Sequence, residues 1–348
     1  MNATVLARLA NQHAIEPRCA TPREVVHALG AVQAQDFAGA LWAIALRTTS
    51  STVTDVEAAI ARREIVRTWP MRGTLHFVDA RDLRWITGLL APRVIRRAAA
   101  RHRDLGLDDK IIAKSRKLVE KDLAGKTISR PGMYELFAAH GIEPTGQRGI
   151  HILGVLAMQR VICFGAHHGK QPSFALCDDW LPKGPDLDGD EALAELATRY
   201  VTSHGPATLA DFCWWSGLAQ GEARRALAAA RIELVDGYAS PASRRAPKLG
   251  THVELLPPYD ELVVAYKDRS DILDPKLVTA TRGGIFSPVV LVDGSIVGTW
   301  KRETKKGRVI VRASLATPLT KAKRALDAAV ARYGSYLGVP AELVVTGP

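Results

Sequence analysis

The sequence predicts an α+β protein in which one helix-rich unit is repeated three times before a β-rich C-terminal region. An order of three helices followed by a β-hairpin recurs along the chain, with hairpins that begin at Ile65, Val161 and Ile232. From Leu255 onward, short apolar and β-branched runs typical of strands replace the helical pattern. Because the hairpins are unevenly spaced, the pattern indicates duplication of a unit and not a solenoid of fixed period.

The first unit opens with a helix for which Thr21 provides the N-cap, Pro22 the first helical position and Glu24 a capping box. Its apolar residues recur at helical spacing. The further predicted elements are a helix at 37–46, a helix that begins with a capping box at 54–57, and hairpin strands at 65–69 and 74–78. Three helices and a hairpin make a winged helix, in which the third helix can enter a DNA groove.

The second and third units repeat this order. In the second, Ser129 caps a helix that Gly141 ends, residues 148–160 form the third helix, and residues 161–176 form a wing with its tip at 166–170. In the third, a helix that starts at 208–211 and a helix at 222–230 precede a hairpin over 232–238 that turns at Asp236-Gly237.

The C-terminal region is predicted to be an antiparallel β-meander followed by a closing helix. The predicted elements are strands at 289–292, 295–300 and 308–311, a basic hairpin tip at 301–307 and a helix at 319–333. The expected domains are therefore residues 1–105, 106–187, 188–250 and 251–348.

Composition narrows the possible functions. The 348 residues carry 47 Lys and Arg against 36 Asp and Glu, a net charge of +11, which favours a polyanionic partner such as nucleic acid. Four cysteines without a C-x-x-C pair predict reduced thiols and no metal site. No apolar run is long enough for a membrane span and no signal peptide is recognised, so we expect a cytoplasmic, nucleoid-associated monomer without a cofactor.

Gln33 and Gln35 are the candidate catalytic residues, because two carboxamides spaced by one residue stand where a helix should be closing. A carboxamide offers donors and an acceptor but exchanges no proton near neutral pH, so it can only orient a water or a leaving group. Residues i and i+2 do not face each other in a helix. Both amides can reach one cavity only if the helix ends or loosens here. Gly30 and Gly39 are the residues at which the backbone could leave the helical conformation.

Several motifs in fixed order resemble the AlkZ and YcaQ family of winged-helix DNA glycosylases. They are Q-A-Q-D at 33–36, R-T-W-P-M-R-G-T-L-H at 67–76, L-L-P-P-Y-D-E at 255–261, Y-K-D-R at 266–269 and V-G-T-W at 297–300. The resemblance covers nearly the whole chain and matches Gln33 and Gln35 to the catalytic Q-x-Q of the AlkZ-like branch. The bulkier apolar residue usual between the two glutamines is replaced by Ala34.

This resemblance implies a C-shaped protein that removes bulky N7-alkylated purines from double-stranded DNA and leaves an abasic site, in repair or in resistance to DNA-alkylating natural products. The chemistry fits the amides. An N7-alkylated purine is already cationic, so its glycosidic bond breaks through an oxocarbenium-like state without a strong acid. Oriented amides can then position the water and stabilise developing charge. We expect a monofunctional glycosylase.

Further side chains are expected at the pocket and on the DNA. The possible pocket residues are Asp36, Arg72, Thr74 and His76. Thr74 and His76 share one face of the predicted wing strand, so both can look out of the core. Asp36 could equally cap the next helix, and a lone strand histidine can be structural. The expected DNA contacts are Arg97, Arg101, Lys267, Arg269, Trp300, Lys301, Arg302, Lys305 and Lys306. For the basic helix at 93–103 and the basic hairpin, a solvated surface is the alternative.

Two other functions stay open at this stage. Winged helices often simply bind DNA, so the chain could be a transcriptional regulator with sequence-specific affinity and no base release. Alternatively, Asp178-Asp179 or Asp260-Glu261 could be the acid/base pair of a different hydrolase. The second alternative explains neither the repeated units nor the basic charge.

Overall fold

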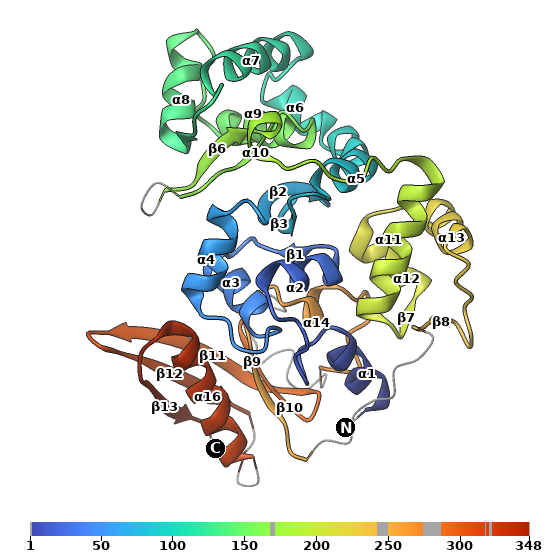
Figure 1. Cartoon of the computed structure of the whole chain (residues 1–348), viewed down its shortest axis with the longest axis vertical. Coiled ribbons are helices and arrows are strands. Elements are labelled where there is room, and N and C mark those ends of the chain that lie inside the picture. The colour runs from blue at the N-terminus through green and yellow to red at the C-terminus, as the bar shows by residue number, and fades with distance from the viewer. Residues whose placement is uncertain are drawn as a thin grey trace.

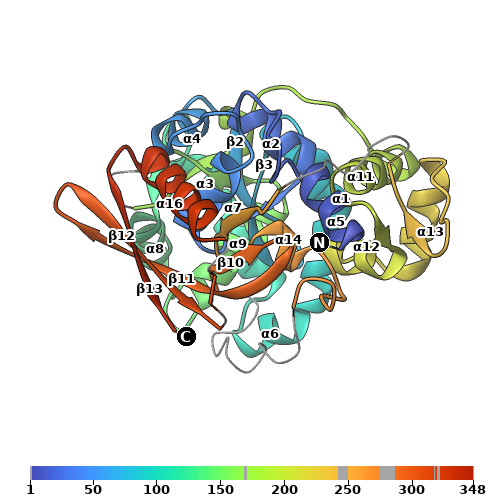
Figure 2. The same cartoon turned by 90° about the horizontal axis from the view of Figure 1, so that it is seen from below.

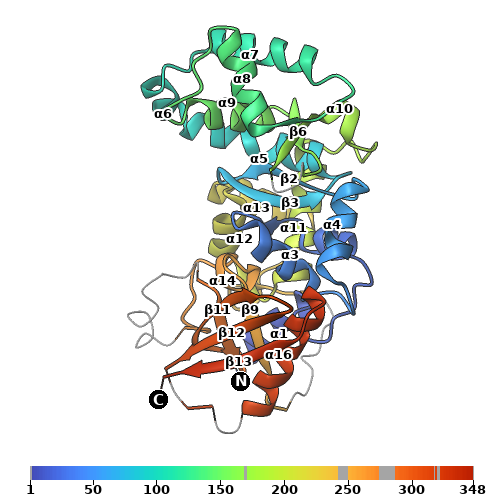
Figure 3. The ribbon, with the colours of Figure 1, turned by 90° about the vertical axis from the view of Figure 1, so that its left-hand side faces the viewer.

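The computed structural model describes residues 2–167, 171–241, 250–273, 287–316, 318–319 and 322–347. The molecule is elongated, with the second unit at one end and the C-terminal sheet at the other (Figures 1 and 3). The first and third units lie side by side between these ends. Seen from below, the hairpin of β11 (Ser295–Lys305) and β12 (Arg308–Leu315) projects on the side opposite the third unit (Figure 2).

The first unit has the predicted helices and hairpin. Its elements are α1 (Ala3–Asn11), α2 (Pro22–Leu29), β1 (Val32–Gln33), α3 (Phe37–Ala45), α4 (Val53–Ala61), β2 (Ile65–Met71) and β3 (Thr74–Asp79), with the sheet order β1-β3-β2. Two details differ from the prediction. The capping box of α4 joins Thr52 and Asp55, two residues upstream of the predicted start. The first apolar helix ends at Leu29, because Gly30 has φ of +76° and turns the chain into β1.

A long basic connector, made of α5 (Leu83–Arg97) and α6 (Ala99–Asp104), leads from the first unit to the second. The elements of the second unit are α7 (Asp109–Asp122), β4 (Ile128–Ser129), α8 (Arg130–Ala139), α9 (Arg148–Met158), β5 (Ile162–Phe164), β6 (Ser173–Leu176) and α10 (Cys177–Trp180). Ser129 caps α8 as predicted, since its side chain accepts a hydrogen bond from the N–H of Gly132. Part of the predicted wing tip, residues 168–170, lies outside the described residues.

The third unit is a reduced version of the same order. It consists of α11 (Gly189–His204), β7 (Ala207–Thr208), α12 (Leu209–Ser216), α13 (Gln220–Ala229) and β8 (Tyr238–Ala239). Thr208 and Asp211 form a capping box at the predicted start of α12. The turn predicted at Asp236-Gly237 is present, because Val235 and Tyr238 exchange two backbone hydrogen bonds across it. The predicted hairpin is reduced to this single bridge, and the strand partner of β8 is β7. The short strand β7, which precedes α12, therefore pairs with β8 in place of the missing wing strand.

The C-terminal region is one five-stranded sheet with a helix. Its elements are β9 (Val253–Leu256), α14 (Glu261–Val264), β10 (Val289–Val292), β11 (Ser295–Lys305), β12 (Arg308–Leu315), α16 (Lys323–Leu337) and β13 (Ala341–Thr346). The predicted meander is antiparallel, but β13 was not predicted and pairs parallel to β12. The predicted basic tip is mostly strand, because β11 continues to Lys305 and the turn falls at Lys306-Gly307.

The hydrophobic core has two main parts. One continuous cluster joins buried residues of the first and third units and the C-terminal sheet, whereas the second unit has a cluster of its own. None of the helices in the described residues is long and apolar enough to cross a membrane.

Candidate active site

The Q-A-Q segment lies outside any helix, which removes the geometric obstacle posed by a helix. Gln33 pairs with His76 of β3, and the N–H of Ala34 donates to the carbonyl of Leu75 at 2.7 Å. Both amides reach the same hairpin, because Gln33 bonds Arg72 and Gln35 bonds the backbone N–H of Leu75. Ala34 is completely buried, so this small residue packs in the core.

Gln33 is held firmly by its neighbours. Only 7% of it is exposed, and its side-chain oxygen accepts a hydrogen bond from Arg72 Nη2 at 3.0 Å. Because a guanidinium has only donors, the oxygen of the amide must face Arg72 and the amide nitrogen must point elsewhere. The backbone N–H of Gln33 donates to Glu261 Oε1 at 2.9 Å.

Gln35 is exposed and held more loosely. Its side-chain oxygen accepts a single hydrogen bond, 3.3 Å long, from the backbone N–H of Leu75. Both amides thus contact the turn of the β2–β3 hairpin, where Arg72 has φ of +56° and Gly73 of +77°. The structure brings Gln33, Gln35 and Arg72 together as the sequence predicted.

His76 supports the site from within the core and does not face outward as we expected. Its ring is fully buried, with Nδ1 3.0 Å from the carbonyl of Thr74 and Nε2 3.1 Å from Arg72 Nη2. Burial and the nearby Arg72 charge lower the pKa of His76 to about 3. The ring is therefore neutral, donates through Nδ1 and accepts through Nε2. The hydroxyl of Thr74 is also buried and has no hydrogen-bond partner in the described residues.

Asp36 is the N-cap of α3, which was one of its two expected roles. Its Oδ1 accepts a hydrogen bond from the N–H of Gly39 at 2.6 Å. A side chain at position 39 would also collide with Pro258, because a Cβ added there would lie 3.0 Å from the proline ring. The glycine thus permits close contact between α3 and the L-L-P-P segment.

Arg67 fixes the carbonyl between the two amides. Its Nε and Nη2 donate to the carbonyl of Ala34 at 3.1 and 2.7 Å, and its guanidinium stacks against the rings of Phe37 and Phe164. Burial lowers the pKa of Arg67 to about 10, so it stays charged at neutral pH. The aromatic residue from β5 links this contact to the second unit.

Glu261 is a site residue that sequence reasoning missed in this role. It is fully buried, and its Oε2 accepts from Trp215 Nε1 at 3.1 Å and lies 3.4 Å from His204 Nε2. Burial alone would raise the pKa of Glu261, but the hydrogen bond with His204 and the nearby charges outweigh it and lower the pKa to about 2. The one sequence feature that could have pointed to Glu261 is the pair of carboxylates, Asp260 and Glu261, at the end of the L-L-P-P-Y-D-E motif.

The two alternative carboxylate pairs are engaged in separate contacts. Asp260 forms a buried bidentate pair with Arg47, whereas Glu261 turns toward Gln33. Asp178 is an exposed partner of Arg84, and Asp179 accepts from the backbone N–H of Gly125. Neither pair converges on one reacting atom, which argues against the hydrolase alternative.

The expected DNA contacts fall into three groups. Lys267, Lys301, Lys305 and Lys306 are exposed on strands or loops. The arginines also have partners within the protein: Arg97 contacts the carbonyl of Gly217, Arg101 bonds Gln147, Arg269 bonds the carbonyl of Val263, and Arg302 bonds Tyr333. Trp300 is only 4% exposed and donates to the carbonyl of Leu256, so it is a packing residue and the expectation that it contacts DNA is wrong.

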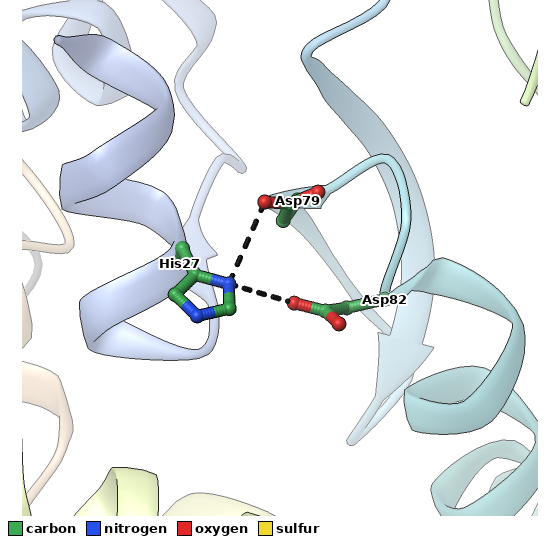
Figure 4. Close-up of side chains that lie close together, drawn as sticks. All are labelled: His27, Asp79 and Asp82. Carbon is green, nitrogen blue, oxygen red and sulfur yellow. Dashed lines mark hydrogen bonds and ion pairs between the residues drawn. The ribbon is translucent and has the colours of Figure 1, made fainter. Parts of the chain in front are cut away.

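One group of side chains in the described part of the chain has spacing that a metal ion could use. His27 Nδ1 lies 3.5 Å from Asp79 and 3.1 Å from Asp82 (Figure 4). Hydrogen bonds that the ring donates to the carboxylates of Asp79 and Asp82 raise the pKa of His27 to about 9, so the ring is a cation. Arg23 and Arg199 also pair with these carboxylates. The donor set does not fit a metal, because positive side chains already neutralise it.

Comparison with known proteins identifies the class as a DNA glycosylase. The family described as "DNA glycosylase AlkZ-like" matches residues 26–336, most of the chain. The chain therefore belongs to the AlkZ-like family of DNA glycosylases. It is 25% identical over 316 residues, 82% of this chain and 84% of the relative, to a protein of Streptomyces sahachiroi named interstrand DNA cross-link repair glycosylase. The solved structure of the S. sahachiroi DNA glycosylase AlkZ is similar in fold, with a TM-score of 0.78, 23% identity and coverage of 99% of this chain and 100% of that one.

Proposed function

We propose that this chain hydrolyses the N-glycosidic bond of N7-alkylated purines in double-stranded DNA and leaves an abasic site. The observation that carries this proposal is the protonation state of the groups around the two amides. His76 is neutral, with a pKa of about 3, and Glu261 is ionised, with a pKa of about 2. Neither can protonate a leaving group at neutral pH, so the base must already be cationic to leave.

The same environment supports a monofunctional enzyme. A lyase step would require an amine nucleophile beside the sugar carbon. Within the described residues, the groups that bond Gln33 and Gln35 are the Arg72 guanidinium, the Glu261 carboxylate and the backbone N–H of Leu75, none of which is a lysine amine. We infer that water is the nucleophile and that the amides orient it. No cofactor or metal takes part in this scheme.

We infer that the three repeated units are winged-helix modules in a C-shaped monomer, with the domain boundaries given above. The recurrence of helix, short strand, two helices and a hairpin in the first two units supports this assignment. We place the DNA along the exposed cations of the β11–β12 hairpin and the basic connector. In the cell, such an enzyme would be cytoplasmic and associated with the nucleoid.

The biological role follows from the expected lesions. The S. sahachiroi relative is named for interstrand DNA cross-link repair. We propose that bulky N7 adducts, including cross-links, are substrates here too, in DNA repair or in resistance to a DNA-alkylating natural product.

The test uses duplexes that carry N7-methylguanine, a bulkier N7 adduct, ethenoadenine or uracil at one position. Alkaline cleavage of the resulting abasic site should reveal release of both N7-alkylated purines and of neither neutral base. Efficient uracil release would contradict the cationic-substrate requirement. Sequence-specific binding without release of any base would favour the transcriptional-regulator alternative.

A further inference from the structure

Two oppositely charged side chains hold Gln33, the partly buried Arg72 and the fully buried Glu261. Arg72 donates to its side-chain oxygen at 3.0 Å, and Glu261 accepts from its backbone N–H at 2.9 Å. Trp215 of the third unit contacts both, because its carbonyl accepts from Arg72 Nη1 and its indole N–H donates to Glu261 at 3.1 Å. The third unit thus contributes to the support of a residue that belongs to the first.

Gln35 has no comparable support among the described residues. Its oxygen receives one hydrogen bond of 3.3 Å from a neutral backbone donor, and its side chain is exposed. The two amides therefore differ in electronic state although they are chemically identical.

The difference has a direct chemical consequence. A hydrogen bond from a charged donor is roughly twice as strong as a neutral one, and in a buried site it polarises the group that accepts it. Arg72 therefore draws electron density toward the Gln33 oxygen, which makes its amide N–H groups stronger donors. The Gln35 oxygen keeps a lone pair for a second hydrogen bond.

We propose that Arg72, Glu261 and Trp215 are positioning residues that make Gln33 the hydrogen-bond donor to the departing purine, whereas Gln35 accepts a hydrogen bond from the attacking water. This division of roles rests on the proposed function. As the C1′–N9 bond breaks, its electron pair moves to the purine and cancels the cationic charge. The Gln33 N–H then stabilises the electron density gained by an acceptor such as N3. The water oxygen bonds to C1′ and releases its proton to solvent.

Replacement of each amide by a carboxylate separates the two roles, because a carboxylate accepts hydrogen bonds but does not donate them. Single-turnover excision of N7-methylguanine should fall by ~100-fold or more in Gln33→Glu, the scale of losing an oriented transition-state donor. It should stay within ~10-fold of wild type in Gln35→Glu, since an acceptor is retained. The opposite order, or equal losses, would overturn the division.

Variants of Arg72 distinguish positioning from DNA contact. Arg72→Met keeps the aliphatic stem and removes the donors, so the single-turnover rate at saturating DNA should fall ~10- to 100-fold while the DNA Kd stays within a few-fold. Arg72→Lys should recover part of the rate, and Trp215→Phe, which removes only the indole N–H, should lower it by a few-fold. A weaker Kd with an unchanged rate in Arg72→Met would mean that Arg72 binds DNA instead.

A measurement on the DNA-free protein separates this inference from the proposed function. In Arg72→Met, the ¹⁵N and ¹H resonances of the Gln33 side-chain amide should move, whereas those of Gln35 should not. Unchanged Gln33 resonances in a folded variant would overturn the positioning role even if wild type excised N7-methylguanine. Failure of wild type to excise any N7-alkylated purine would instead refute the proposed function. The NMR result would then still show whether Arg72 positions the Gln33 side chain.

Discussion

Arg47 and Asp260 form a bidentate ion pair in which both side chains are fully withdrawn from solvent. The two nitrogen-to-oxygen distances are each 2.9 Å. The pair joins the end of the first unit's α3 to the residue that precedes Glu261. It therefore fixes the segment whose next side chain supports Gln33.

Loss of this pair should destabilise the whole protein. Asp260→Ala leaves a buried guanidinium without its partner, and we expect the free energy of unfolding to fall by about 3–5 kcal/mol. Chemical denaturation monitored by tryptophan fluorescence measures this change. Asp178→Ala is the matched control, because Asp178 forms an exposed pair with Arg84 and should cost less than about 1 kcal/mol. Equal effects of the two substitutions would contradict a supporting role for the buried pair.

Sequence reasoning located Gln33, Gln35 and the hairpin that contains Arg72 because each depends on local signals. Turn residues and strand composition predict the β2–β3 hairpin, and the amides stand out as a pair. The role of Glu261 could not be found in this way. Its contact with Gln33 joins positions 228 residues apart, and only the packing of the C-terminal region against the first unit determines it.

The expectations that the structure contradicts also concern contacts between residues far apart in the sequence. Alternation on a strand suggested that His76 faces outward, but its ring is fully buried beside Arg72, which in turn bonds the carbonyl of Trp215 in the third unit. The C-terminal strand β13 pairs parallel to β12 across α16, a long-range choice that no local pattern specifies. Trp300 was expected to be an exposed aromatic at the base of a basic hairpin, yet α16 covers it through Tyr333.

Removal of the amides should slow catalysis without weakening binding. Gln33→Ala and Gln35→Ala should each lower single-turnover excision by ~10- to 1000-fold, the scale of one oriented transition-state group. DNA affinity should change only a few-fold, because phosphate contacts supply most of it. Rapid-quench kinetics and fluorescence anisotropy measure the two quantities. Near-normal excision by the double variant would remove both residues from the catalytic assignment.

The cluster around His27 predicts a pH-dependent contribution to stability. The pKa of His27 is raised from 6.5 to about 9, so its stabilisation is complete below pH 6.5 and is lost as the pH rises through 9. The contribution should be at most about 1 kcal/mol, because solvent screens ion pairs of half-exposed groups.

Unfolding free energies of wild type and His27→Gln should therefore converge between pH 7 and pH 10. His140→Gln is the control, since that ring is exposed and contacts only a backbone carbonyl of its own helix. A difference that grew with pH would mean that the ring is neutral in the folded protein.

The exposed cations of the β11–β12 hairpin should govern affinity for DNA. Lys301, Lys305 and Lys306 are exposed, and Arg302, although it bonds Tyr333, lies on the same strand. Neutralising all four residues should weaken binding to every DNA sequence alike, because phosphate contacts carry no sequence information. The slope of log Kd against log salt should also flatten, by up to ~0.9 for each lost phosphate contact.

The control variant neutralises four exposed lysines of α7, which lies at the opposite end of the molecule (Figure 1): Lys110, Lys114, Lys117 and Lys121. It removes the same number of positive charges, so any effect of net charge alone would appear in both variants. A salt titration by fluorescence anisotropy should show a flatter slope only for the hairpin variant. If that variant instead kept the affinity and slope of wild type, the hairpin would be a solvated surface and the DNA would dock elsewhere.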